Sequence, residues 1–190
     1  MIPFTLETVT LACKTIHSNT TTKEQKSEAD VFLNDLLNSQ EAWTITRELV
    51  VNSNPNDFDI IFMGANILYQ KIKQDYSTLS KEHRQELDNF LLATVQKITE
   101  TSNNKLVLSM VCRIYALVGL FQLGLSQNPT FMSSVYSQID PNNLANLSTK
   151  QIGLLLSIFA EIAGEYESLL LERKRMMFII NNLNENKDNI

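Results

Sequence analysis

The fold of this chain is decided by residues 23–73, which read KEQKSEADVFLNDLLNSQEAWTITRELVVNSNPNDFDIIFMGANILYQKIK. Apolar residues recur three and four positions apart in three segments, and short polar breaks separate the segments. The pattern predicts three consecutive amphipathic helices; a capping box at Thr22–Gln25 starts the first, and Trp43 opens the second. Each apolar face has to be buried by a neighbouring helix. The stretch therefore indicates a stacked helical scaffold whose work is binding.

The same periodicity continues on both sides and predicts an all-α protein. We expect further helices at about residues 6–16, 80–98, 106–123, 148–162 and 166–183, with a polar tail at 184–190. Asn128-Pro129 is typical of one more helix start. Paired into hairpins, the second helices would begin near Thr22, Asp57, Asn104 and Ser148. This pitch of roughly 35 to 47 residues is typical of HEAT repeats. The predicted fold is a right-handed α-α superhelix of about four HEAT-like hairpins plus one extra helix, over residues 1–183.

Composition limits the function classes. The net charge of −5 and the pI near 5.1 argue against direct nucleic-acid binding and against an anionic membrane surface. Cys13 and Cys112 lie inside apolar helical patterns, so we interpret them as buried thiols in a reducing compartment. The first residues lack the basic and apolar regions of a secretory signal. Residues 106–125 are apolar enough to approach a membrane span, but their place in a regular helical series favours a buried central helix and no membrane insertion.

The sequence gives little reason to expect an enzyme, a metal or a cofactor. It contains no glycine-rich phosphate loop and no Cys-x-x-Cys pair, and His17 and His83 fall in different predicted repeats. Carboxylate pairs such as Glu165 and Glu167 are interpreted as helix-start residues that serve the macrodipole. Arg173-Lys174-Arg175 favours a solvated helix face. We therefore predict no catalytic residues and no metal ligands.

One segment of the deciding stretch, Ala42-Trp43-Thr44-Ile45-Thr46-Arg47-Glu48-Leu49, resembles transport receptors of the importin-β superfamily. In the branch that contains transportin-SR and importin thirteen, an Ala-Trp-x-Ile opens the first helix of the second HEAT repeat. The helix that follows ends in a Lys-Ile pair, which Lys71-Ile72 matches. The other matching pieces, in the order of the family, are residues 29–37, 62–72, 106–112, 154–165 and 173–183. The resemblance thus extends over nearly the whole chain.

The resemblance implies a receptor N-terminus that binds the GTP-bound form of the small GTPase Ran on its concave face. It also implies protein cargo, nucleoporins as further partners, and a location in cytoplasm and nucleus. In the family, the second helices of the first repeats carry the GTPase contact. The positions that correspond here are Asp30, Asn34, Asn66, Tyr69, Gln70, Lys71, Lys73, Ser109 and Arg113. Lys71 is the best match to the family, whereas Asn66 and Tyr69 have a second interpretation, in which they pack between helices.

The chain departs from the family at Met110, which stands where a basic residue is common, and at Gly119, which weakens its helix by about 1 kcal/mol relative to alanine. Family members are several times longer, so the resemblance implies a terminal fragment or a truncated relative. The alternative hypothesis is a HEAT or armadillo-like scaffold for protein–protein interaction that is unrelated to transport.

Overall fold

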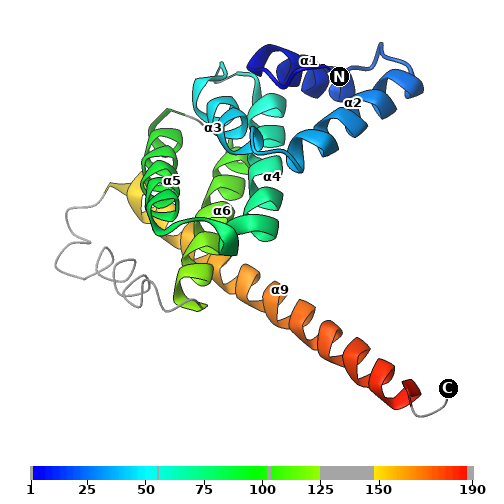
Figure 1. Cartoon of the computed structure of the whole chain (residues 1–190). Helices are drawn as coiled ribbons and strands as arrows, with labels where there is room; N and C mark the ends of the chain where they lie inside the picture. Colours follow the sequence, from blue (N-terminus) through cyan, green and yellow to red (C-terminus); the bar gives the residue numbers. More distant parts are fainter. Residues whose placement is uncertain (1, 55, 102–103, 125–147, 188–190) are drawn as a thin grey trace.

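The computed structural model of the chain describes residues 2–54, 56–101, 104–124 and 148–187. These residues form seven α-helices and one short 3-10 helix, η1, and they contain no strand. The helices, labelled as in Figure 1, are α1 (Leu6–His17), α2 (Lys23–Leu37), α3 (Ala42–Asn52), α4 (Phe58–Asp75), η1 (Tyr76–Thr78), α5 (Lys81–Thr101), α6 (Lys105–Gly124) and α9 (Thr149–Lys187). The all-α fold that the periodicity predicts is confirmed.

Side-chain caps explain where several helices begin. The Thr22 hydroxyl accepts a bond from the Gln25 amide, and the Gln25 side chain accepts one from the Thr22 amide, which confirms the predicted capping box of α2. Ser148 and Gln151 form the same reciprocal pair at the start of α9. The Asn104 carboxamide oxygen accepts from the amide of Leu106 at the start of α6. The predicted starts near residues 22, 104 and 148 therefore agree with the structure.

Consecutive helices pack as hairpins, α1 with α2, α3 with α4, and α5 with α6 (Figure 1). The second helices also contact one another, α2 with α4, α4 with α6, and α6 with α9. Along α6 and α9 the contacts advance in the same direction, from Ser109–Glu161 to Arg113–Glu165, so these two helices run parallel. The predicted array of helical hairpins is confirmed, and its second helices form one continuous layer.

Two hydrophobic clusters hold the array together, and α4 contributes to both. Ile60 and Ile67 of α4 belong to the cluster built with α1, α2 and α3. Leu68 and Ile72 of α4 belong to the cluster built with α5, α6 and α9. Burying one leucine or isoleucine side chain stabilises the fold by about 1.5–3 kcal/mol, so α4 joins two substantial cores. Ile67 and Leu68 are adjacent and point about 100° apart on the helix, so they reach different neighbours and α4 is apolar on two sides.

Helix α6 fits the predicted role of a buried central helix. It is the one helix, among the residues described, that is long and apolar enough to cross a membrane, over Lys105–Gln122. Most of that window is buried inside the molecule, against α4, α5 and α9. Its apolar character is accounted for by packing on several sides.

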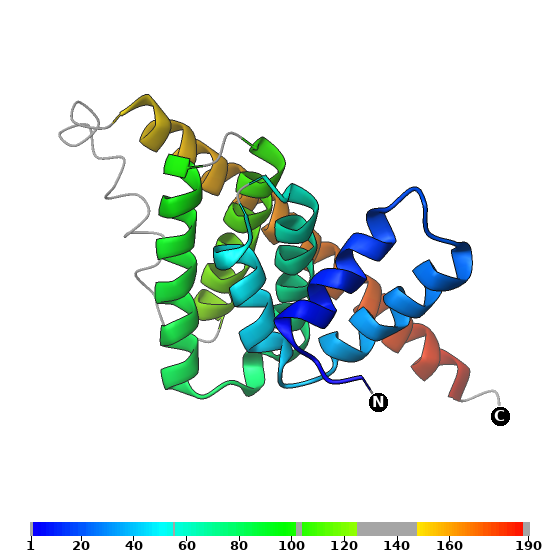
Figure 2. The ribbon, with the colours of Figure 1, turned by 90° about the horizontal axis from the view of Figure 1, so that it is seen from above.

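The structure differs from the sequence-based prediction at the C-terminal helices. Residues 148–162 and 166–183 were expected to form two helices, but α9 runs without a break from Thr149 to Lys187. It also continues into the expected polar tail. Gly164 lies at the predicted break, and one glycine costs a helix only about 1 kcal/mol, which a long packed helix tolerates. The predicted start at residues 128–129 lies outside the described residues. Figure 2 shows α9 crossing behind α6 and α4 before its end extends past the body.

Candidate protein-binding face

Four of the residues assigned by resemblance lie together on the layer of second helices. Tyr69 and Lys73 come from α4, and Ser109 and Arg113 come from α6; we call these four the α4–α6 polar face. Each pair is spaced by four residues, so both members project from the same side of their helix. All four form hydrogen bonds to side chains of α9. Tyr69 and Lys73 bond to α9 from α4, and Ser109 and Arg113 bond to it from α6. The α4–α6 polar face therefore meets α9, and the three helices α4, α6 and α9 form a junction there.

The centre of this junction is a bonded group of Tyr69, Arg113 and Glu165. The Tyr69 hydroxyl donates to Glu165 Oε2 over 2.9 Å, and Arg113 Nη2 donates to the Tyr69 oxygen over 3.2 Å. Arg113 Nε donates to the other oxygen of Glu165. The guanidinium carbon of Arg113 also lies 4.7 Å from the centre of the Tyr69 ring, within the range of a cation–π contact. Glu165 is 2% exposed, and the bonds from Tyr69 and Arg113 satisfy both of its buried oxygens.

The contacts within this group shift the pKa values of Tyr69 and Arg113. Burial, reinforced by the bond to Glu165 and its charge, raises the pKa of Tyr69 from 10.0 to about 12. Partial burial of Arg113 acts against its positive charge, but the bond to Glu165 and its charge outweigh that effect and raise the pKa of Arg113. At neutral pH Tyr69 is therefore a neutral phenol, and Arg113 keeps its positive charge.

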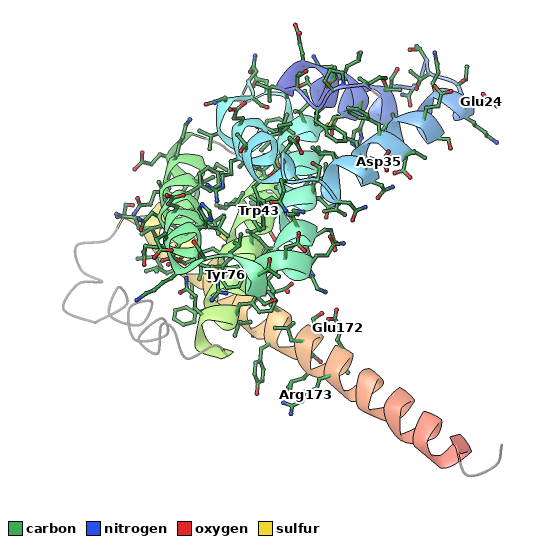
Figure 3. All side chains as sticks on the ribbon, viewed as in Figure 1. Glu24, Asp35, Trp43, Tyr76, Glu172 and Arg173 are labelled. Carbon is green, nitrogen blue, oxygen red and sulfur yellow. The ribbon has the colours of Figure 1, made fainter. Side chains whose placement is uncertain are left out.

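Two further bonds extend the junction along α9. The Ser109 hydroxyl donates to Glu161 Oε1 over 2.6 Å. Lys73 Nζ lies 2.6 Å from Glu172 Oε1, and it also lies 5.9 Å from the centre of the Tyr69 ring. Figure 3 shows Glu172 where α9 leaves the body, next to the exposed Arg173. The acceptors Glu161, Glu165 and Glu172 form what we call the acidic edge of α9.

The other predicted contact residues do not join this junction. Asp30 and Asn34 are exposed on α2, where the Asn34 amide donates to the Asp30 carbonyl over 3.0 Å and to its carboxylate over 3.3 Å. Gln70 is exposed on α4, and Asn66 is half-buried there. Tyr69 is 4% exposed, which agrees with the interpretation that it packs between helices.

Lys71 is placed differently from the prediction. Only 1% of it is exposed, its Nζ lies 2.7 Å from Asp75 Oδ2, and it sits over the Trp43 ring at 6.0 Å. Residues two positions apart on a helix point about 200° away from each other, so Lys71 faces α3 whereas Lys73 faces α9. Lys71 therefore lies apart from the α4–α6 polar face, and its assignment to the GTPase contact rests on the resemblance alone.

The acidic edge of α9 was missed by the sequence interpretation. Glu165 was assigned to a helix start, but α9 begins at Thr149, far beyond the first turn to which a macrodipole effect is confined. Its neighbour Glu167 is exposed, whereas Glu165 is buried in the junction. A signal was present, because positions 161, 165 and 172 recur at helical spacing on one side. It becomes visible only if residues 148–183 are read as a single helix.

Both cysteines of the chain are buried. Burial raises the pKa of Cys13 to about 11 and that of Cys112 to about 12, so both thiols are poor nucleophiles. No group of three or more potential metal-binding side chains converges in the described part of the chain. An open groove of about 320 Å³ lies between α1 and α2, lined chiefly by residues such as Ile2, Leu11 and Phe32.

Comparison with known proteins adds one relative. No family model matches the chain. A protein of Schizosaccharomyces pombe, described as uncharacterized, is 31% identical to it over 107 residues. The match covers 56% of this chain and 11% of the relative, so the chain spans about a tenth of the relative's length.

Proposed function

We propose that this chain is the N-terminal part of a nuclear transport receptor, which binds the GTP-bound form of a Ran-like GTPase and takes part in nucleocytoplasmic protein transport. The observation that carries the proposal is the shared layer of second helices. Tyr69, Lys73, Ser109 and Arg113, which the resemblance assigns to the GTPase contact, lie on this one layer. The proposal does not depend on Lys71, which is buried.

The physical basis of binding is charge and shape complementarity over a broad face. Stacked helical repeats present extended surfaces of this kind. Lys73 keeps about a quarter of its side chain exposed, and Gln70 is exposed on the same helix. Charged groups at the rim of an interface increase association rates and select the correct partner. Cargo and nucleoporins would then bind elsewhere on a longer receptor, which moves between cytoplasm and nucleus.

The test is nucleotide-dependent binding by the 190-residue chain. Ran loaded with a non-hydrolysable GTP analogue, and Ran loaded with GDP, are immobilised in parallel, and the dissociation constants are measured by biolayer interferometry. We expect the GTP form to bind at least about tenfold more tightly, which corresponds to 1.4 kcal/mol. Equal binding, or none, would favour the alternative of a helical scaffold unrelated to transport.

Charge-reversal variants locate the contact. Lys73→Glu is expected to weaken binding to the GTP form, because it removes a partly exposed cation from the face. Lys81→Glu is the matched control, since it makes the same charge change at an exposed position of α5, a first helix of its hairpin. If both variants weaken binding equally, the effect reflects net charge and Lys73 is not a contact.

A further inference from the structure

Helix α9 consists of two parts that are held in different ways. Its first part buries Ile158 and Ile162 in the cluster shared with α5 and α6, and Leu155 is buried as well. Beyond Gly164, by contrast, Tyr166, Leu170 and Leu171 are exposed. In that second part, over the residues whose side chains are described, the contacts to the body include the bonds of Glu165 and Glu172 and the partly buried Leu169. We call residues 165–172 the strap.

Gly164 marks the junction between the anchored part and the strap. A Cβ atom added at this position would meet open space, so packing does not require glycine there. Glycine is the least favourable residue in a helix interior apart from proline, because it has the most backbone freedom to lose. The helix is therefore intrinsically weak just after Ile162, the last fully buried apolar residue of α9 among those described.

Carboxylates of the strap form ion pairs with the two cations of the α4–α6 polar face, Lys73 and Arg113. Glu172 pairs with Lys73, and Glu165 pairs with Arg113. These two carboxylates are seven residues apart, which places them on one side of a helix two turns apart. Any ligand that uses Lys73 and Arg113 as its charge partners has to compete with them.

We propose that the strap is an exchangeable acidic segment: it covers the α4–α6 polar face in cis, and a partner carrying carboxylates at helical i and i+7 positions binds there once the strap has moved away. This inference rests on the proposed function in naming the GTPase as the physiological competitor. The exchange itself depends only on charge complementarity and on the weak link at Gly164. The strap thereby sets how tightly the face binds such a partner.

A peptide in trans tests the exchange on the full chain. The probe is a fluorescently labelled peptide of residues 158–173, and its control carries glutamine at 165 and 172. In the chain, Glu172→Gln removes one half-exposed carboxylate and leaves the core untouched. We expect this variant to bind the probe about two- to fivefold more tightly than the wild type, the factor expected from one exposed ion pair. The control peptide should bind neither chain measurably.

Stiffening the junction should have the opposite effect. Gly164→Ala is expected to weaken probe binding, whereas Gly153→Ala, an equally open glycine in the anchored part of α9, should leave it unchanged. Hydrogen exchange of the wild-type chain provides a second readout, in which amides of the strap exchange faster than those of residues 152–162. Equal protection of both parts would overturn the strap as an exchangeable segment. Equal affinities of the wild type, Glu172→Gln, Gly164→Ala and Gly153→Ala for the probe would overturn it as well.

The two proposals fail in different ways. If the probe exchanges as expected but the GTP form of Ran is not preferred, the strap stands and the transport function fails. If the GTP form binds selectively and Glu172→Gln changes neither probe nor GTPase affinity, the strap is a permanent packing contact and the transport function stands.

Discussion

Lys71 and Lys73 of α4 show how position on a helix decides what a residue can do. The ammonium of Lys71 is enclosed between Trp43 and Asp75, and that of Lys73 reaches Glu172 at the edge of the molecule. Breaking an enclosed ion pair destabilises the fold, since removal of one partner leaves an uncompensated buried charge. The exposed pair, in contrast, contributes at most about 1 kcal/mol and is free to exchange partners.

Tyr69 provides a test at the residue scale. Tyr69→Phe removes the hydroxyl that donates to the buried Glu165 and accepts from Arg113, so we expect the free energy of unfolding to fall by about 1–2 kcal/mol. Urea denaturation measures this change. Tyr166→Phe is the control, because Tyr166 is 57% exposed, and its effect should stay within about 0.5 kcal/mol. Equal effects of the two variants would mean that the junction adds nothing to stability.

At the scale of whole helices, the close approach of α3 and α4 depends on a glycine, Gly64. A Cβ atom added to Gly64 of α4 would lie 2.7 Å from Leu49 Cβ of α3, and neither atom is the flexible end of a side chain. The hairpin α3–α4 is therefore closed by the absence of a side chain at Gly64. Gly153 of α9 has no such neighbour.

Substituting the two glycines separates close approach from helix propensity. We expect Gly64→Ala to destabilise the chain by about 1–3 kcal/mol through overpacking. Gly153→Ala should instead stabilise it by up to about 1 kcal/mol, because alanine favours the helix and meets open space. Thermal unfolding of both variants measures the contrast. Stabilisation by Gly64→Ala would show that α3 and α4 separate easily.

The starts of helices could be predicted from sequence because their signals are local. Thr22 and Gln25 make their capping bonds within four residues, and so do Ser148 and Gln151. The continuity of α9 could not be predicted in this way, since a local glycine signal was outweighed by packing at Ile158 and Ile162. The acidic edge was missed for the same reason, because its alignment requires an unbroken helix.

Predicting the candidate site required knowing which sides of α4 are covered. Apolar residues surround α4 on two sides, so periodicity alone assigns no single buried face to it. Tyr69 was correctly placed among the second-helix residues, and its packing between helices was one of two interpretations. The burial of Lys71 depends on Trp43 from another helix, and only the tertiary structure brings that pair together.

At the scale of the whole molecule, two cysteine thiols and a tyrosine phenol are kept neutral by burial inside the two hydrophobic clusters. Burial raises the pKa of Cys13 from 9.0 to about 11 in the first cluster. Burial likewise raises the pKa of Cys112 and that of Tyr115 to about 12 in the second cluster. Because α4 contributes to both clusters, ionisation in either one is expected to affect the stability of the array as a whole.

These shifts predict the direction of an alkaline transition. The groups ionise at lower pH in the unfolded chain than in the folded one, so stability is complete below about pH 9 and falls as the pH rises toward 11 to 12. Each group contributes a slope of about 1.4 kcal/mol per pH unit within its own window. Urea midpoints between pH 8 and 11 measure the fall. Replacing both cysteines by alanine should reduce the slope just above pH 9, and an unchanged slope would refute the assignment.

The position of Trp43 has a spectroscopic consequence. It is the sole tryptophan of the chain and lies on α3, with the Lys71 ammonium beside its ring. Figure 3 places it well away from Glu172. Trp43 also packs against the cluster built by α4, α5, α6 and α9, so its fluorescence reports the packing of α3 on α4 and on that cluster. A ligand that displaces only the end of α9 would leave this emission unchanged, whereas opening of the α3–α4 hairpin would alter it, so one optical signal separates the two events.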